Sequence, residues 1–365
     1  EDAFILEAGK KIASCIMQSV QKKRVTLLVG KGNKGADAYA AGLALAEEGF
    51  FVQAAALYPP DSCTEWNKNF ARRFAKRGKI VSVWDKEKIP FDADLLIDGM
   101  LGTGFRGKAE GICEAVIRFA NTSGRPIWSI DLPSGIDGAT GAVGSVAVQA
   151  THTIALGMAK IGCFLGEGWN HTNHLAVEDF GLPSSCIHEA KAIAYLPDPM
   201  RFHLPRLVQN RHKYEAGYVL GYAGSDLLKG APKLAGLAAL RSGAGIVRIF
   251  HEGKIGEAPM ELICQGWNAK LFSQELKRAN AVFIGPGLGK KRPKWIQSLK
   301  LPAVFDADIL QKQMLFPRSS ILTPHRGEML RLLGLKEFPQ EEDFLARCHK
   351  FAEKRKVILV LKGAP

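Results

Sequence analysis

The sequence predicts an α/β protein of two domains, each built on a largely parallel sheet. Its 365 residues are more than one ordinary domain needs and enough for two. In both halves short apolar runs of β type alternate with helical patterns, and most of these runs end in glycine-rich or polar loops. Near residue 190 the pattern gives way to a proline-rich, polar stretch, so we predict domains at 1–190 and 191–365.

The first half is typical of a doubly wound domain. We expect its helix at about 39–48 and its strands at 25–29, 51–57, 95–97, 126–130 and 153–156. In such sheets the ligand site lies outside the carboxyl ends of the strands. The residues that follow each strand are therefore the candidates for function.

The second half repeats this alternation. We expect helices at 233–241 and 341–354, and strands at 218–222, 246–250, 281–284, 303–305 and 357–361. The chain has no visible internal repeat and no low-complexity segment. A second α/β domain with its own strand-end site follows from this pattern.

The composition narrows the cellular compartment and the classes of binding partner that we expect. The seven cysteines include no CxxC pair, which favours a reducing, cytoplasmic compartment over a disulfide framework or a zinc site. No apolar run is long enough to span a bilayer, so we expect no membrane partner. The net charge of +13 suits an anionic ligand. Because the basic residues are spread thinly and no nucleic-acid motif is present, we expect a phosphorylated small molecule and no nucleic acid.

A glycine-rich loop, Gly30 to Gly35, follows the strand at 25–29 and fits the pattern GxGxxG. Glycines there let the backbone approach a phosphate, and the start of the following helix favours negative charge. An NAD dehydrogenase would also carry an acid at the end of the next strand to hold the ribose. That strand ends at Leu57-Tyr58-Pro59 without an acid, which weakens the dehydrogenase interpretation.

Charged residues follow three later strands of the first half. Asp98 follows the strand at 95–97 and Asp131 the strand at 126–130, while Lys160 comes after the strand at 153–156. A second glycine-rich loop with two basic side chains lies at 102–108. The topology brings these groups to one rim, where a carboxylate can act as a proton base.

These segments together resemble the N-terminal domain of the NAD(P)H-hydrate epimerases, a Rossmann-like fold, across essentially the whole first half. The resemblance implies binding of NADHX and NADPHX, whose R and S epimers at C6 this family interconverts. It implies substrate binding by Asn33, Lys34, Gly35, Ala36, Asp37, Gly102, Thr103, Gly104, Phe105, Arg106, Gly107, Lys108 and Asp131. It also implies that Asp98 and Ser134 help to hold a potassium ion. Asp131 is the expected proton-transferring residue, and Lys160 is a second candidate.

The first loop departs from the family pattern at Lys34, where the family has an asparagine that contributes to the potassium site. We hypothesise that the Lys34 amine replaces the ion and contacts Asp98, because an ammonium and a potassium ion carry the same charge. The alternative is a catalytically weakened half, in which Ala36 and Ala38 crowd a close approach of the backbone.

The second half carries the ordered segments Gly285-Pro286-Gly287-Leu288-Gly289, Asp306-Ala307-Asp308 and Thr323-Pro324-His325. They resemble the ADP/ATP-dependent NAD(P)H-hydrate dehydratases, which have a ribokinase-like fold. The resemblance implies that Ala231, Gly289 and His325 contact the hydrated nucleotide and that Lys362 and Gly363 begin the nucleotide-phosphate site. The implied reaction phosphorylates the C6 hydroxyl with ADP and then eliminates phosphate. Taken alone, His325 is better explained as a buried, satisfied histidine after a proline turn.

Relative to this family the second domain is expected to be truncated. The family's Gly-Thr-Gly-Asp segment, which supplies an anion-binding helix start and the catalytic aspartate, is missing before Pro365. We therefore expect a fragment, without dehydratase activity as it stands and with both activities if the gene continues. Magnesium with the nucleotide and a homo-oligomeric assembly are further expectations.

Two other functions remain open from the sequence. A ribokinase-like small-molecule kinase would explain the second half but not the strand-end residues of the first. A non-catalytic nucleotide-binding protein with the epimerase fold would explain the altered loop at Lys34, and binding without turnover would identify it.

Overall fold

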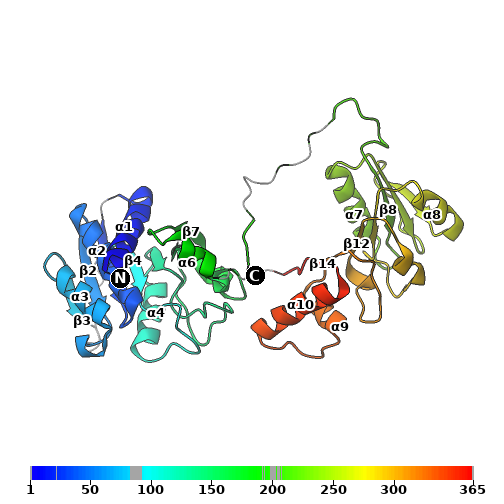
Figure 1. The fold of residues 1–365 in the computed structure, drawn as a ribbon. Coiled ribbons are helices and arrows are strands. Elements are labelled where there is room, and N and C mark those ends of the chain that lie inside the picture. Colours follow the sequence, from blue (N-terminus) through cyan, green and yellow to red (C-terminus); the bar gives the residue numbers. More distant parts are fainter. Residues whose placement is uncertain are drawn as a thin grey trace. The chain divides into compact units, whose positions relative to one another are not determined.

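The computed structural model describes residues 2–21, 23–82, 93–190, 192, 194–197, 203, 206 and 208–363. The chain forms two compact units, Glu1–Asp198 and Pro199–Ala364, and each has its own sheet (Figure 1). The functional boundary that composition places near residue 190 stays a prediction. Among the described residues, no helix is both long enough and apolar enough to cross a bilayer.

The first unit is built on a sheet of seven strands in the order β3-β2-β1-β4-β5-β6-β7, as far as the chain is described. All neighbouring strands are parallel. The strands are β1 (Arg24–Val29), β2 (Phe51–Ala56), β3 (Lys79–Ser82), β4 (Leu95–Gly99), β5 (Ile127–Ile130), β6 (His152–Leu156) and β7 (His174–Glu178). The order reverses between β1 and β4, which makes their carboxyl ends the topological switch point.

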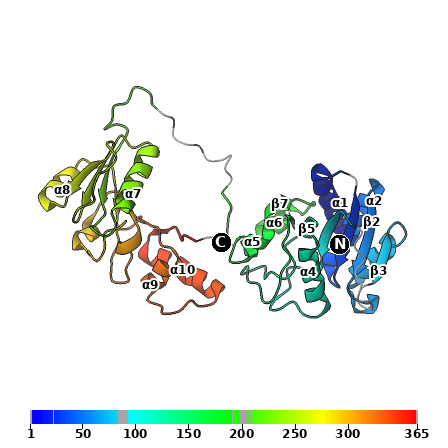
Figure 2. The same cartoon turned by 180° about the vertical axis from the view of Figure 1, so that it is seen from behind.

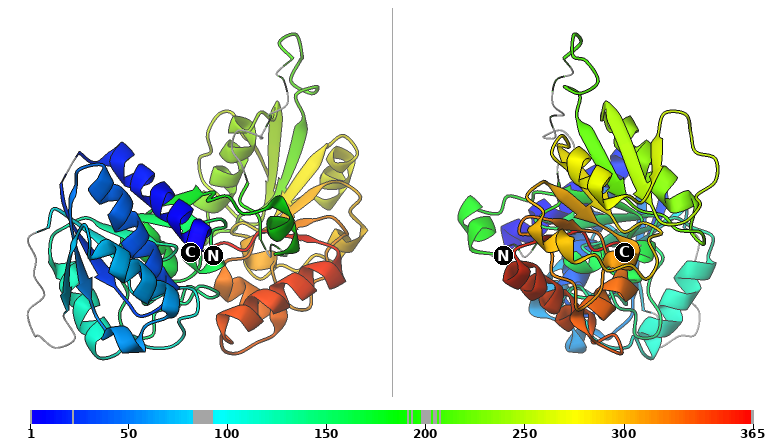
Figure 3. Two further views of the ribbon diagram at one scale, coloured as in Figure 1. Left: turned by 60° about the vertical axis from the view of Figure 1, so that its left-hand side comes forward. Right: turned by 90° about the vertical axis from the view of Figure 1, so that its right-hand side faces the viewer.

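Helices cover both faces of this sheet (Figures 1 and 2). They are α1 (Asp2–Ser19), α2 (Asn33–Glu47), α3 (Glu65–Phe74), α4 (Ile112–Thr122), α5 (Gly168–Thr172) and α6 (Ser184–Glu189), with 3-10 turns η1 (Pro60–Ser62) and η2 (Ile161–Cys163). Side chains alternate between the faces along β1: Leu27 packs with α1, α2 and α3, whereas Leu28 packs with α4. Figure 3 shows α1, in dark blue, lying along α2.

The second unit repeats this topology with strands in the order β10-β9-β8-β11-β12-β13-β14, again all parallel. The strands are β8 (Tyr218–Tyr222), β9 (Ile246–His251), β10 (Ile263–Gly266), β11 (Ala281–Ile284), β12 (Ala303–Phe305), β13 (Ile321–Leu322) and β14 (Ile358–Leu359). The helices are α7 (Gly230–Arg241), α8 (Ala269–Leu276), α9 (Arg326–Leu333) and α10 (Glu341–Arg355), with 3-10 turns η4 (Lys294–Ser298) and η5 (Ala307–Ile309). Its switch point lies between β8 and β11.

The expected fold class, two successive parallel α/β units, is confirmed. One boundary was wrong in a way that matters for function. The first helix begins at Asn33 rather than near Tyr39, so the last part of the expected glycine loop is already the first turn of α2. Five strands of the first unit were expected; the structure adds β3 and β7 at the two edges of the sheet.

Candidate active site

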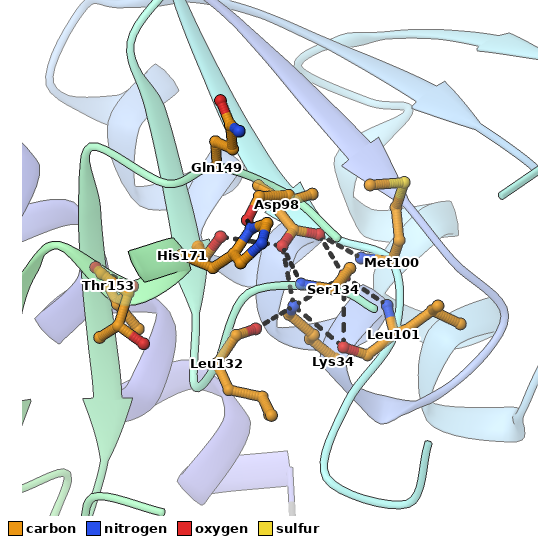
Figure 4. A network of polar contacts seen from close by, with 12 residues as sticks. Lys34, Asp98, Met100, Leu101, Leu132, Ser134, Gln149, Thr153 and His171 are labelled. Carbon is orange, nitrogen blue, oxygen red and sulfur yellow. Dashed lines mark hydrogen bonds and ion pairs between the residues drawn. The ribbon is translucent and has the colours of Figure 1, made fainter. Parts of the chain in front are cut away.

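The candidate site of the first unit lies at the switch point, where β1 leads into α2 and β4 leads into the loop after Gly99. Lys34, in the first turn of α2, extends toward Asp98 at the end of β4 (Figure 4). Both residues are buried, with 6% of Lys34 and none of Asp98 exposed. The expected contact between them is confirmed by a hydrogen bond of 3.2 Å from Lys34 Nζ to Asp98 Oδ2.

The Lys34 ammonium is surrounded by oxygen atoms from three segments of the chain. Besides Asp98 it donates to the backbone oxygens of Leu101 and Leu132, at 3.0 and 2.8 Å, and to Ser134 Oγ at 3.0 Å. Figure 4 shows these partners converging on the amine. Four oxygens around one cationic nitrogen form the kind of cage that a monovalent cation requires. Lys34 thus ties β4, the loop after it and the 132–134 segment to the start of α2.

The Asp98 carboxylate is held by further donors. It accepts hydrogen bonds from the backbone nitrogens of Met100 (3.1 Å) and Ser134 (2.8 Å) and from Ser129 Oγ (2.9 Å). The Ser134 hydroxyl donates to Asp98 and accepts from the Leu101 backbone nitrogen at 2.8 Å. These donors fix the position of the Asp98 carboxylate at the end of β4.

The electrostatics of this pair are those of a buried ion pair. Burial lowers the pKa of Lys34 from its ordinary value, and the charge of Asp98 opposes that shift. Asp98 and Ser134 are the residues expected to hold potassium, and the Lys34 amine contacts both of them. The site therefore does not fit a potassium ion, because the amine occupies the place of the ion. No cluster of three His, Cys, Asp or Glu side chains suited to a metal occurs in the described part of the chain.

A second charged group, Asp131 with Lys160, lies next to this cage. Asp131 Oδ1 accepts a hydrogen bond from Lys160 Nζ and another, of 3.3 Å, from the backbone nitrogen of Leu156. Asp131 has a φ of 68°, in the left-handed region that costs most residues energy. The side chains of Asp131 and Lys160 are 17% and 25% exposed, so both groups are accessible to a ligand.

Asp37, one turn into α2, belongs to the same group. Burial and the negative charge of Asp131 raise its pKa to about 7, while Lys34 and Lys160 oppose the shift. Asp37 is therefore a carboxyl group that gains or loses its proton near neutral pH. The chain 131–134 connects the two parts of the site, because Asp131 contacts Lys160 while Leu132 and Ser134 contact Lys34.

The expected loop at 102–108 lies beside the site and is mostly exposed. Arg106 donates to the backbone oxygens of Thr103 and Phe105 and forms an ion pair of 3.1 Å with Asp137. Arg106 thereby links this loop to the segment that carries Asp131. Gly107 has a φ of +82°, a conformation that favours glycine.

The roles of the residues in the first loop differ from one another. The Asn33 side chain accepts a hydrogen bond of 3.0 Å from Thr64 Oγ1, and Lys34 fills the cage. Ala36 and Ala38 are fully buried in the core, so their methyl groups point into the protein and not toward a ligand. A Cβ on Gly35 would lie 2.3 Å from Asn67 Nδ2, which makes glycine necessary there.

Sequence reasoning missed Asn67 and the two carbonyl ligands of Lys34. The Asn67 amide donates to the backbone oxygens of Gly30 and Gly32, at 2.8 and 3.0 Å, and so fixes the first loop from α3. The only indication of Asn67 in the sequence is that it is a polar residue on the apolar face of α3. That helix was not predicted. The carbonyls of Leu101 and Leu132 carry no sequence signal, because every residue has one.

In the second unit the expected nucleotide residues gather at the carboxyl ends of β12, β13 and β14. Lys362 Nζ donates to Asp306 Oδ1 at 2.6 Å, and Thr323 Oγ1 donates to the same oxygen at 2.8 Å. Lys362 also forms a parallel bridge with His325. Gly363 lies beside the side chain of Arg326.

The interpretation of His325 as a buried histidine was wrong, because 55% of its side chain is exposed. His325 is the N-cap of α9: its Nδ1 accepts from the backbone nitrogens of Gly327 and Glu328, at 3.1 and 3.3 Å. The Glu328 side chain accepts in return from the His325 backbone nitrogen at 2.8 Å, which completes a capping box.

Ala231 and Gly289, the other expected substrate residues, lie at the switch point of the second sheet. Ala231 is the second residue of α7, which follows β8, and a Cβ on Gly287 would come within 3.4 Å of it. Gly289 has a φ of +70° and donates its backbone N–H to Asp308 at 2.9 Å. These two residues and His325 therefore lie along one rim of the sheet.

Comparisons with known proteins follow this division into two units. Residues 1–162 match the family model described as "YjeF-related protein N-terminus", and residues 219–365 match the one described as "NAD(P)H-hydrate dehydratase". A bifunctional NAD(P)H-hydrate repair enzyme from Moorella thermoacetica is 30% identical over 400 residues, covering 98% of this chain and 75% of that protein. One from Archaeoglobus fulgidus is 31% identical over 377 residues, with the same coverage of 98% and 75%.

Among solved structures, part of the chain is similar to an ADP/ATP-dependent NAD(P)H-hydrate dehydratase from Bacillus subtilis, co-crystallised with ATP and Mg²⁺. That likeness has 28% identity and a TM-score of 0.35, and it covers 44% of this chain and 62% of that one. The relatives, by contrast, match both units in one alignment. The chain therefore belongs to the family of bifunctional NAD(P)H-hydrate repair enzymes.

Proposed function

We propose that the first unit epimerises hydrated NADH and NADPH at C6 and that the Lys34 ammonium takes the place of a bound potassium ion. Family membership supports the reaction. The observation that carries the second part is the cage of four oxygens around Lys34 Nζ, at 2.8 to 3.2 Å. A cation supplied by the chain itself needs no ion from solution.

Asp131 and Lys160 are the proposed proton-transfer groups. C6 of the hydrated ring bears a hydroxyl and is bonded to the ring nitrogen. When a base removes the hydroxyl proton, the C6–N bond can open to an aldehyde, and reclosure on the other face gives the other epimer. The proton returns to the oxygen, so atoms balance without a co-reactant. Asp131 accepts and returns this proton, and the Lys160 ammonium stabilises its carboxylate.

Lys34 is a positioning residue in this proposal. Its amine does not face the substrate, because only 4% of the side chain is exposed. It fixes the carbonyl of Leu132, the residue after Asp131, and so holds the base in place. Asn33, Asp37 and the 102–108 loop are proposed to bind the substrate around this base.

The test is a chromatographic assay in which the purified chain is incubated with the R epimer of NADHX, without nucleotide. We expect the S epimer to form faster than by the spontaneous reaction, at the same rate with and without added potassium. A strong increase of the rate with potassium would contradict the role of Lys34. Tight binding of NADHX without acceleration would instead identify a non-catalytic binding protein.

For the second unit we propose a part in the dehydratase reaction of the family, within a protein that also carries the Gly-Thr-Gly-Asp segment with the catalytic aspartate. ADP or ATP phosphorylates the C6 hydroxyl of the S epimer and leaves as AMP or ADP. Loss of phosphate from C6 together with a proton from C5 then restores the double bond of NAD(P)H. Phosphate is a far better leaving group than hydroxide, which is why a nucleotide is consumed. Ala231, Gly289 and His325 are proposed to bind the substrate, and Lys362 and Gly363 the nucleotide phosphates, with magnesium as their counter-ion. The measurement is ADP-dependent formation of NADH absorbance from S-NADHX.

Two further proposals concern the setting of these reactions. The first is that the protein is cytoplasmic, which is supported by its seven cysteines all being free. A homo-oligomer is the proposed assembly, and analytical ultracentrifugation of the purified chain measures it. A monomer at all concentrations would contradict this proposal.

A further inference from the structure

A cavity lies in the first unit, on the other side of the first glycine loop from Asp131. It has a volume of about 410 Å³ and is lined by residues of α3 and of the carboxyl ends of β1 and β2. This volume falls in the range of about 300–1,000 Å³ that small-molecule sites occupy. None of the epimerase residues expected from the sequence lines it, and Gly30 is where it meets the loop.

The cavity exists because small residues stand where the sheet and α3 face each other. Gly30, Ala56, Ala71 and Ala75 line it and leave the space open. Asn67 keeps the wall in place, because its amide binds the backbone oxygens of Gly30 and Gly32. The space is therefore a built feature of the fold, held by hydrogen bonds to the same loop that borders the active site.

Tyr39 contributes a polar group that lacks a protein partner. Only 2% of this residue is exposed, and its ring packs against Phe74 with centroids 5.6 Å apart. Its hydroxyl makes no hydrogen bond to a described residue, and its oxygen is not closed off from solvent, so it is available at the cavity wall. Because Tyr39 lines the cavity, a bound molecule can supply that partner.

The walls combine the features that an adenine nucleotide requires. Val29, Ile80 and the ring of Tyr58 offer an apolar and aromatic surface to a base. Two contacts fix the Tyr58 ring. Its hydroxyl lies 3.1 Å from Cys113 Sγ, and Lys31 Nζ lies over the ring, 5.5 Å from its centroid.

Charged side chains complete the lining. The carboxylate of Asp61 suits a ribose hydroxyl and the cation of Arg72 suits a phosphate, while Glu65 and Lys68 form an ion pair of 2.8 Å with each other. The sequence lacks an acid directly at the end of β2, but Asp61 and Glu65 bring carboxylates to the same place from η1 and α3.

We infer that this cavity binds the adenosine monophosphate half of the hydrated dinucleotide, while Asp131 acts on the nicotinamide half. In doubly wound sheets a dinucleotide lies across the switch point, with its pyrophosphate at the first glycine loop. Here the cavity lies on the β2 side of that loop and the Asp131–Lys160 pair on the β5–β6 side. The inference rests on the proposed epimerase function and assigns to its substrate a second binding region.

The first test uses 5′-AMP as a probe of the full chain. AMP is expected to inhibit epimerisation of R-NADHX competitively, and Tyr39→Phe or Arg72→Gln is expected to weaken the inhibition about tenfold, the worth of one charge-assisted or buried hydrogen bond. Arg73→Gln is the matched control, because Arg73 pairs with Asp2 and does not line the cavity. Inhibition that is non-competitive, or equal in all variants, would overturn the inference.

The second test compares R-NADHX with the hydrated mononucleotide, which lacks the adenosine monophosphate half. The wild-type chain is expected to show a lower KM for the dinucleotide, and Arg72→Gln is expected to reduce this preference about tenfold while Arg73→Gln keeps it. An unchanged preference in Arg72→Gln would contradict the binding of the adenosine monophosphate half in this cavity. A wild-type chain that converts neither substrate contradicts the epimerase proposal, and calorimetric AMP binding in the same variants then tests the cavity without catalysis.

Discussion

Lys34 Nζ lies 3.2 Å from Asp98 Oδ2 in a part of the first unit where both side chains are buried. A lysine at this position places a covalently attached cation among oxygens that otherwise suit a metal ion. The pair also connects β4 to α2 across the switch point, so its energetics bear on both stability and function.

Removing the ammonium is expected to leave a buried charge without a partner. Lys34→Met should lower the free energy of unfolding by about 3–5 kcal/mol, the usual cost of breaking a buried ion pair. Lys34→Asn should be destabilised similarly in choline chloride but regain stability with added potassium, because its shorter side chain leaves room for the ion. Thermal melts in matched salts measure this.

The Met variant is the control for that rescue, since its side chain fills the space and offers no oxygen ligand. Lys10→Asn, at an exposed lysine, controls for loss of charge alone. If potassium stabilises all the variants equally, the oxygens around Lys34 Nζ do not bind potassium when the amine is removed.

Asp37 predicts a pH dependence of stability. Its pKa in the folded protein is about 7, above the ordinary 3.8, so the folded state binds more protons than the unfolded state between these values. The free energy of unfolding should therefore fall as pH rises from about 4 to 7, by an amount on the order of 4 kcal/mol, and stay level above that.

Asp37→Asn should remove this dependence and be more stable than the wild type above pH 7, as measured by urea unfolding at several pH values. Glu110→Gln, at an exposed carboxylate, serves as the control. A wild-type profile that parallels that of Asp37→Asn would show that Asp37 is ionised at low pH.

Asp131 and Lys160 are expected to affect catalysis more than folding. Asp131→Asn should reduce kcat for epimerisation by about 10²–10⁴-fold, as loss of a general base does. Asparagine tolerates the left-handed conformation at φ 68°, so the backbone should be kept. Lys160→Met should also lower kcat, because the Asp131 carboxylate loses the ammonium that holds it. Rates within threefold of the wild type would contradict these roles.

Two glycines of the first loop should respond differently to the same change. A Cβ on Gly30 would lie 1.9 Å from the backbone oxygen of Met100, whereas one on Gly32 would meet nothing within 4 Å. Gly30→Ala should therefore cost about 1–3 kcal/mol and Gly32→Ala less than about 1 kcal/mol. Chemical denaturation compares them, and equal effects would place the constraint elsewhere in the loop.

His325 combines a structural and a proposed binding role that substitution can separate. His325→Ala should cost about 1 kcal/mol because α9 loses its N-cap, while His325→Asn keeps a capping acceptor and most of the stability. Both variants lose the imidazole and should bind hydrated NADPH less tightly, which calorimetry measures. If His325→Asn binds hydrated NADPH as tightly as the wild type, the only role of His325 is to cap α9.

The sequence by itself determined the fold class of both halves and the strand ends that carry Asp98, Asp131 and Lys160. Hydrophobic periodicity and glycine-rich turns are local features, and parallel strands bring their carboxyl ends to one edge whatever their exact lengths. The contact of Lys34 with Asp98 followed from the family resemblance, because a cation at the family's cation-binding position needs the same counter-charge.

Only the tertiary structure decided the rest of the site. The carbonyls of Leu101 and Leu132 became ligands through the path of the chain, which no residue type encodes. Asn67 and the cavity lined by α3 depend on how closely that helix approaches the first loop. The buried methyl groups of Ala36 and Ala38 depend on α2 beginning at Asn33, because one turn of helix decides which side chains face the core.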